Sequence, residues 1–270
     1  MWYVMHNLFF NEVDMKSKKF KDRTVLVTGA GSGIGAKIAE HLGLLGATVA
    51  IVDINSNILE AKKEEFLAKG INVLTYCADI SKYDSCKIAY EYFYNKIGFI
   101  DTLINNAGIS PKHEGKPHKI WELAPEEWVT VVNVNLNGTF NFISLLVPEM
   151  INNKFGKIIN TSSVAANAFL PIVSCHYSAT KAAITGLTRH LAGELGAYNI
   201  NVNAVAPGRI ETPMVTAVGE KVNNIFITDT PLGRLGAPQE VAEVIEFLAS
   251  DQSSFVTGQI IDVAGGWLMR

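Results

Sequence analysis

Short apolar runs rich in β-branched residues alternate along this chain with longer segments of helical periodicity, and this alternation limits the fold more than any other feature. The first run, Thr24–Thr28, is followed at once by a glycine-rich turn and then by a helical pattern over 34–45. Further runs with strand character lie at 48–53, 72–77, 102–105, 156–161, 201–205 and 259–263. Helical patterns between them cover 54–69, 83–97, 125–152, 175–198 and 238–250.

Parallel strands joined by helices of roughly ten or more residues form a sheet that helices cover on both faces. We therefore predict a Rossmann-type α/β fold with a doubly wound parallel sheet of about seven strands. The 270 residues are 48% hydrophobic and 18% charged, which suits a single domain with a buried core. Two irregular segments, Ser110–Ile120 and Glu211–Arg234, follow strand ends at the ligand-binding edge, so we expect them to act as lids.

We divide the chain into an N-terminal extension over 1–19 and a single domain over 20–270. The first residues are apolar, but they lack a basic start and run directly into Asn11 and Glu12, so we interpret them as an extension and not as a signal peptide. Met15 precedes a short basic run, which leaves Met1 and Met15 as alternative starts of translation.

Charge and cysteine content exclude several classes of function. The net charge is −3 and the basic residues are scattered, so we expect a small ligand and no nucleic-acid partner. Cys77, Cys86 and Cys175 are widely spaced and form no CxxC pair, which argues against a disulfide framework and a zinc site and favours a reducing, cytoplasmic location. No continuous apolar run reaches the ~18 residues of a membrane span, so we expect no membrane partner. We also expect no metal, because the cysteines form no CxxC pair.

The glycine-rich turn gives the first indication of a ligand. Gly29, Gly33 and Gly35 lie between a strand and a helix, where the backbone can approach a pyrophosphate at the helix N-terminus. Asp53 ends the second strand, where its carboxylate can bind the adenosine ribose diol and would repel a ribose 2′-phosphate. Because the turn carries Ser32 and no basic residue, we expect a dinucleotide-binding domain that takes NAD in preference to NADP.

Tyr177 and Lys181 are four residues apart in a predicted helix, which places them on one face about 5–6 Å apart. A phenol titrates near pH ~10, but a neighbouring ammonium favours the phenolate and lowers that pKa. The pair can therefore move a proton on and off an alcohol. The same spacing also occurs in ordinary surface pairs, so the other residues of the chain have to support this interpretation.

Several further motifs occur in a fixed order along the chain. They are Asp79-Ile80, Asn105-Asn-Ala-Gly108, Asn135 within Val-Asn-Leu-Asn-Gly, Ser163 within Thr-Ser-Ser-Val, and Pro207-Gly208 with Ile210 and Thr212. Together with the glycine turn and the Tyr177/Lys181 pair, these motifs resemble those of the classical short-chain dehydrogenase/reductase family, from about Phe20 to the C-terminus.

The resemblance implies a catalytic set of Asn135, Ser163, Tyr177 and Lys181. Tyr177 would exchange the proton of the substrate hydroxyl, Lys181 would bind the nicotinamide ribose, Ser163 would hold the substrate oxygen, and Asn135 would hold a water. The resemblance also implies a homotetramer. The residues expected to contact the cofactor are Gly29, Ser32, Gly33, Ile34, Gly35, Asp53, Asp79, Ile80, Asn105, Ala107, Gly108, Tyr177, Lys181, Pro207, Gly208, Ile210 and Thr212.

The substrate is less well defined by the sequence. Our leading hypothesis is an NAD-dependent dehydrogenase that oxidises a secondary alcohol or reduces the ketone of a small hydrophilic substrate such as a sugar, polyol or hydroxy acid. A 3-oxoacyl-[acyl-carrier-protein] reductase is the alternative, and a catalytically silent binding homologue is less favoured. The basic and histidine residues of Ser110–Ile120 fit either recognition of an anionic substrate or a solvated loop.

Overall fold

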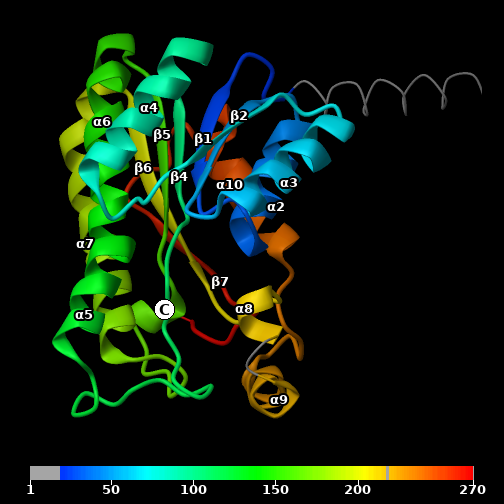
Figure 1. Ribbon diagram of the computed structural model, residues 1–270, viewed down its shortest axis with the longest axis vertical. Coiled ribbons are helices and arrows are strands. Elements are labelled where there is room, and N and C mark those ends of the chain that lie inside the picture. The colour runs from blue at the N-terminus through cyan, green and yellow to red at the C-terminus, as the bar shows by residue number, and fades with distance from the viewer. Residues whose placement is uncertain (1–18, 217–218, 270) are drawn as a thin grey trace, which may run out of the picture.

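The computed structural model describes residues 19–216 and 219–269, and its centre is one parallel sheet (Figure 1). The strand order is β3-β2-β1-β4-β5-β6-β7, with every neighbouring pair parallel. The predicted doubly wound, seven-stranded sheet is therefore confirmed. The strands are β1 (Thr24–Thr28), β2 (Thr48–Asp53), β3 (Val73–Cys77), β4 (Thr102–Asn105), β5 (Gly156–Thr161), β6 (Ile200–Pro207) and β7 (Ile260–Val263).

Two layers of helices cover the sheet (Figure 1). One layer holds α2 (Gly33–Leu44), α3 (Ser56–Ala68) and α10 (Pro238–Ala249). The other holds α4 (Tyr83–Ile97), α5 (Pro125–Val132), α6 (Gly138–Asn153) and α7 (Cys175–Leu195). Two short helices, α8 (Pro213–Thr216) and α9 (Glu220–Asp229), lie with the loop after β4 at one end of the molecule.

The central strand shows how the sequence pattern produces these layers. Val25 and Val27 of β1 pack in the core with α2 and α10, whereas Leu26 packs with α4 and α6 on the other face. All three side chains are fully buried. Successive side chains of a strand point to opposite faces, so a strand with helices on both sides must be apolar throughout.

The structure differs from the sequence prediction in two irregular regions. The helix expected over 125–152 is interrupted by a π-helical segment, Asn133–Asn137, which separates α5 from α6. The segment Glu211–Arg234 contains α8 and α9, which the sequence pattern did not predict because both helices are short. The segment Ser110–Ile120 has no helix, as expected, and contains one isolated bridge between His113 and Lys116.

The segment Pro125–Asn153 is long and apolar enough to cross a membrane, by length and composition alone. Its apolar side chains have another use, because Phe142, Leu146 and Met150 are buried against the sheet and α4. Core packing therefore accounts for the composition of this segment. The predicted N-terminal extension, with its alternative start at Met15, lies outside the described residues apart from its last position.

The chain reverses direction across the sheet at β1, which pairs with both β2 and β4. Ligands bind at such a switch point, outside the carboxyl ends of the strands. The turn that leaves β1 is tightly packed there. Gly29 has a φ of +63°, and a Cβ atom on Gly35 would lie 2.2 Å from the Gly29 carbonyl oxygen. Glycine at position 35 therefore allows α2 to start directly against β1.

We expect Gly35→Ala to destabilise the protein by about 1–3 kcal/mol, because the added methyl group would overlap backbone atoms that cannot move freely. Gly186→Ala in α7 is the matched control, since a Cβ atom there has no neighbour within 4 Å. The free energy of unfolding of both variants, measured by urea denaturation, checks this expectation. Equal stability of the two variants would show that the turn is less constrained than the structure indicates.

Candidate active site

A cleft of about 420 Å³ lies at the carboxyl ends of the central strands. Most of the residues that the sequence predicted for cofactor binding and catalysis line it. They are Gly29, Ser32, Gly33, Ile34, Asp53, Asp79, Ile80, Ala107, Gly108, Ser163, Tyr177, Lys181, Pro207, Gly208, Ile210 and Thr212. The fold thus brings segments that are far apart in the sequence to one site.

Acidic side chains mark the end of the cleft beside β2 and β3. The Asp53 carboxylate accepts a hydrogen bond from the Gly31 backbone N–H at 3.0 Å and one from the Asn55 N–H at 3.2 Å. These bonds fix the carboxylate next to the glycine turn. Asp79 accepts hydrogen bonds from the Ser81 hydroxyl and backbone N–H, and the hydroxyl bond is the main cause that lowers the Asp79 pKa.

The cationic side chains of the cleft come from other segments. Among the described residues, the lysine and arginine residues that line it are Lys112, after β4, Lys181, on α7, and Arg209, after β6. The β2 end therefore presents carboxylates, and the opposite end presents positive charge. This distribution fits a ribose diol beside Asp53 better than a ribose 2′-phosphate.

Tyr177 and Lys181 lie on one face of α7, as predicted, with the Lys181 Nζ atom 5.7 Å from the centre of the Tyr177 ring. The Lys181 ammonium donates a hydrogen bond to the Thr161 carbonyl oxygen at 2.7 Å. Burial lowers the Lys181 pKa to about 8. Burial also raises the Tyr177 pKa, and a hydrogen bond with Ser163 opposes this rise. Burial of the Tyr177 hydroxyl thus opposes the lowering of its pKa that we expected from Lys181.

Ser163 is positioned by the end of β5. Its hydroxyl oxygen accepts a hydrogen bond from the Ala165 backbone N–H at 3.2 Å and caps a short 3-10 turn. The preceding residue, Ser162, instead donates to the Lys181 carbonyl oxygen at 2.9 Å and supports α7. The two adjacent serines thus have separate environments, and Ser163 is the one that contacts Tyr177.

Asn135 lies in the π-helical segment and does not line the cleft. Its side chain accepts from the Ile109 N–H at 2.8 Å, and donates to the Ile109 carbonyl at 3.0 Å and to the Thr180 hydroxyl at 3.2 Å. The extra residue of a π turn rotates the helix locally, which is how such segments often serve functional sites. Asn135 therefore ties the chain after β4 to the turn of α7 between Tyr177 and Lys181.

Gly35 and Asn105 also lie outside the cleft lining. Gly35 is packed beneath the glycine turn. The Asn105 side chain is buried within the sheet, where it donates a hydrogen bond to Asn160 at 3.0 Å. The Asn105 side chain therefore links β4 to β5, and the expected cofactor contact of this residue stays a prediction.

An apolar wall beside Tyr177 was missing from the sequence prediction. Leu170 and Phe226 are buried in it, and Ile172 and Trp267 pack against them. All four side chains line the cleft. The wall combines a loop, α9 and the C-terminal segment, so no local periodicity could reveal it. The apolar Trp267 near the C-terminus was the one visible signal of this wall in the sequence.

Two residues near Tyr177 do not join the catalytic cluster. His176 is fully buried and forms a hydrogen bond with Glu127 at 3.0 Å, so it packs away from the cleft. Cys175 is exposed and does not line the cleft.

Comparison with known proteins matches residues 29–268 to a family described as enoyl-(acyl carrier protein) reductase. The chain is 42% identical over 250 residues to the 3-oxoacyl-[acyl-carrier-protein] reductase FabG of Thermotoga maritima, covering 92% of this chain and 98% of that protein. A 3-oxoacyl-[acyl-carrier protein] reductase structure from Brucella melitensis is 50% identical, with a TM-score of 0.92 and 96% coverage of both chains. Another from Brucella melitensis, described with bound NAD, is 48% identical, with a TM-score of 0.90 and the same coverage.

We expect Tyr177→Phe to reduce turnover by at least about 100-fold, because the substituted ring keeps its packing and loses the hydroxyl that exchanges the proton. The cofactor should still bind with nearly unchanged affinity, since most of the cleft is untouched. Steady-state kinetics check the expected loss of turnover, and a direct titration with NADH checks the cofactor affinity. Substantial turnover in the variant would remove Tyr177 from the proton-transfer role.

Proposed function

The chain belongs to the classical short-chain dehydrogenase/reductase family, and we propose that it is an NADH-dependent reductase of 3-oxoacyl thioesters. The observation that carries this proposal is the apolar wall beside Tyr177. An acyl chain can lie against such a surface, whereas a polyol would leave several hydroxyl groups there without hydrogen-bond partners. The second of the two substrate hypotheses is therefore favoured over the hydrophilic alcohol that the sequence suggested first.

The details of the wall support an extended apolar ligand. Phe226 and Trp267 lie with ring centres 6.3 Å apart, and Leu170 is buried beside them. Arg209 lies over the Phe226 ring at 5.1 Å and is held by two hydrogen bonds to Asn223, at 2.8 and 3.1 Å. The wall thus has a charged rim, where the polar thioester part of a substrate can remain hydrated. The similarity to proteins described as 3-oxoacyl-[acyl-carrier-protein] reductases agrees with this assignment.

NADH is the proposed cofactor because of the acidic end of the cleft. The fixed Asp53 carboxylate can accept hydrogen bonds from both hydroxyls of an adenosine ribose. It would repel a 2′-phosphate, and the described lysine and arginine residues of the cleft lie on other segments. The similar Brucella melitensis structure with bound NAD supports the same choice.

The protonation state of Tyr177 favours reduction of a ketone. A bound nicotinamide supplies the hydride for the carbonyl carbon. The raised pKa keeps Tyr177 protonated at neutral pH, which is the form that donates a proton to the developing alkoxide. The Ser163 hydroxyl can donate a hydrogen bond to the same oxygen, a role typically worth ~3 kcal/mol. Lys181 lies where it can hold the nicotinamide ribose, and its Thr161 bond fixes that position.

We also propose that the protein assembles into a homotetramer through the helical segment Pro125–Asn153, which contains α5 and α6. Trp128, Val129 and Phe140 on α5 and α6 expose 39%, 52% and 54% of their surface. These apolar side chains are suitable for a contact between copies of the chain.

The substrate proposal is tested by NADH oxidation with acetoacetyl carrier protein, acetoacetyl-CoA, longer 3-oxoacyl thioesters and a panel of oxidised sugars and polyols. We expect turnover with the thioesters. Phe226→Ala should raise KM for the longer thioesters about tenfold or more, since lost apolar contact with a substrate costs about 1–3 kcal/mol. Phe255→Ala is the control, because Phe255 is fully exposed and lies outside the cleft lining. Turnover restricted to the sugar or polyol panel would overturn the proposal.

A further inference from the structure

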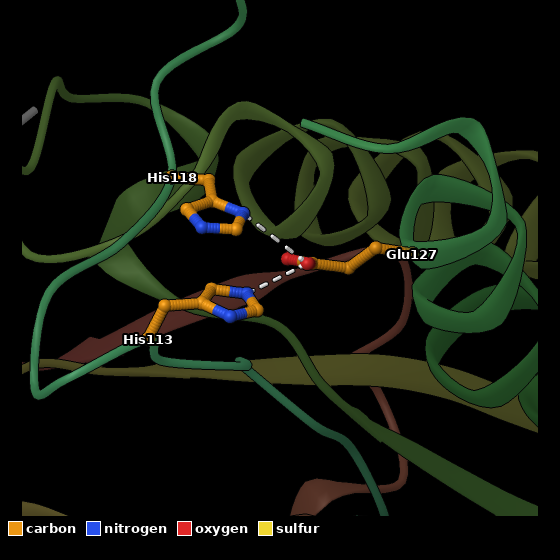
Figure 2. A group of neighbouring side chains, drawn as sticks. All are labelled: His113, His118 and Glu127. Carbon is orange, nitrogen blue, oxygen red and sulfur yellow. Dashed lines mark hydrogen bonds and ion pairs between the residues drawn. The ribbon is translucent and has the colours of Figure 1, made fainter. Parts of the chain in front are cut away.

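Two histidines and one carboxylate converge beside the cleft (Figure 2). His113 and His118 come from the loop after β4, and Glu127 comes from the first turn of α5. The His113 Nε2 atom lies 2.7 Å from Glu127 Oε2, and the His118 Nδ1 atom lies 3.5 Å from the same oxygen. These three potential ligand atoms all lie within 4.8 Å of one another.

The loop builds this arrangement from its own backbone. Glu114 and Gly115 have φ angles of +48° and +81°, which are typical of a tight hairpin turn. The turn is closed by two backbone hydrogen bonds between His113 and Lys116, at 2.8 and 2.9 Å. The chain then returns so that the His118 ring stacks on the His113 ring, with centres 3.4 Å apart and planes inclined by 2°. Both rings face Glu127 (Figure 2).

Glu127 is oriented by a partner on its other side. Its Oε1 atom forms a hydrogen bond with His176 Nε2 at 3.0 Å, and His176 is fully buried. Burial would raise the Glu127 pKa, but the hydrogen bonds from His176 and His113 outweigh it and lower the pKa. A hydrogen bond that fixes a carboxylate from behind is also the usual arrangement around metal ligands.

The hydrogen bonds within this cluster leave one ring nitrogen without a partner. His118 Nδ1 is buried and has no hydrogen-bond partner among the described residues, although it points toward Glu127. Two ring nitrogens and a carboxylate oxygen therefore surround a point where one divalent cation would satisfy all three.

We propose that His113, His118 and Glu127 bind one zinc-type divalent cation. Two imidazoles and one carboxylate are a common ligand set for zinc, with water in the fourth position. At zinc–ligand distances of about 2.0–2.2 Å, tetrahedral ligands lie about 3.3 Å apart, so His113 and Glu127 need to separate only slightly. A surface pocket beside the three ligands is lined by Lys112, Lys116 and Lys119. The positive charge of these lysines is balanced by the carboxylates of Glu114, Glu122 and Glu127.

The cation would fasten the loop after β4 to α5. Ser110 and Lys112 of this loop line the cleft, and Lys112 Nζ donates a hydrogen bond to the Ile172 carbonyl oxygen in the apolar wall. The site therefore acts on the substrate end of the cleft by holding the loop. It holds none of the groups assigned to proton or hydride transfer, so zinc binding can be measured independently of the proposed function. The cysteine spacing argued against a zinc site, and the histidines gave no signal in the sequence because they meet only after the loop has folded.

The test is a calorimetric titration of the full-length, chelator-treated protein with zinc chloride at pH 7.5. We expect one zinc per chain with a Kd in the micromolar range or below. His113→Ala and His118→Ala should each weaken binding at least tenfold. His190→Ala and Cys175→Ser are the controls and should bind as the wild type does, because both residues are exposed and lie outside the cluster. Absence of stoichiometric binding, or equal affinity in all variants, would overturn the proposal.

Thermal unfolding gives a second readout that detects a misfolded variant. Without zinc, the two loop variants should unfold at nearly the wild-type temperature, because the loop is at the surface. Zinc should raise the unfolding temperature of the wild type and of the two controls, and should leave that of the loop variants unchanged. A zinc-induced rise of the same size in His118→Ala would place the cation elsewhere and contradict the site.

Discussion

The parallel pairing of β1 with both β2 and β4 is the constraint on which the rest of the structure depends. This pairing sends the chain to opposite sides of the sheet, and it leaves the ends of the central strands free of crossing helices. The glycine turn after β1, Asp53 at the end of β2 and Gly108 after β4 meet at that opening. The close approach of α2 to β1, which Gly35 permits, then points a helix N-terminus into the cleft.

Desolvation controls the chemistry at the other end of the cleft. Tyr177 and Lys181 are withdrawn from water on α7, and each is shifted toward its neutral form, with a raised phenol pKa and a lysine pKa of about 8. A buried lysine is costly for stability, and here the Thr161 carbonyl and the Asn135 network hold the surrounding backbone in place. The site therefore contains a poised proton donor before any ligand binds. An apolar wall next to that donor decides which ketones can reach it.

Much of the fold could be predicted from the sequence, and the reasons are local. β-branched runs such as Thr24–Thr28 and Thr48–Asp53 were bounded correctly, because Gly29 follows the first directly and the acidic Asp53 ends the second. The π-helical segment around Asn135 escaped prediction, since its composition continues the helical pattern of its neighbours. Residues carried by motifs, such as Ser163 and Tyr177, were placed at the cleft in advance. The wall around Phe226 could not be, because its side chains come from separate segments. The stacked histidines belong to one loop, but they meet only after that loop has folded.

The central claim is that one cleft holds a dinucleotide at its acidic end and a 3-oxoacyl thioester against its apolar wall. A crystal structure of the protein with NADH and an unreactive 3-oxoacyl thioester analogue tests this most directly. The account predicts the adenosine ribose on Asp53, the nicotinamide ribose on Lys181, and the oxygen at the position of the substrate ketone within hydrogen-bond distance of Tyr177 and Ser163. The acyl chain should lie against Leu170, Phe226 and Trp267. An acyl chain bound away from this wall, or an adenosine ribose that makes no contact with Asp53, would contradict the account.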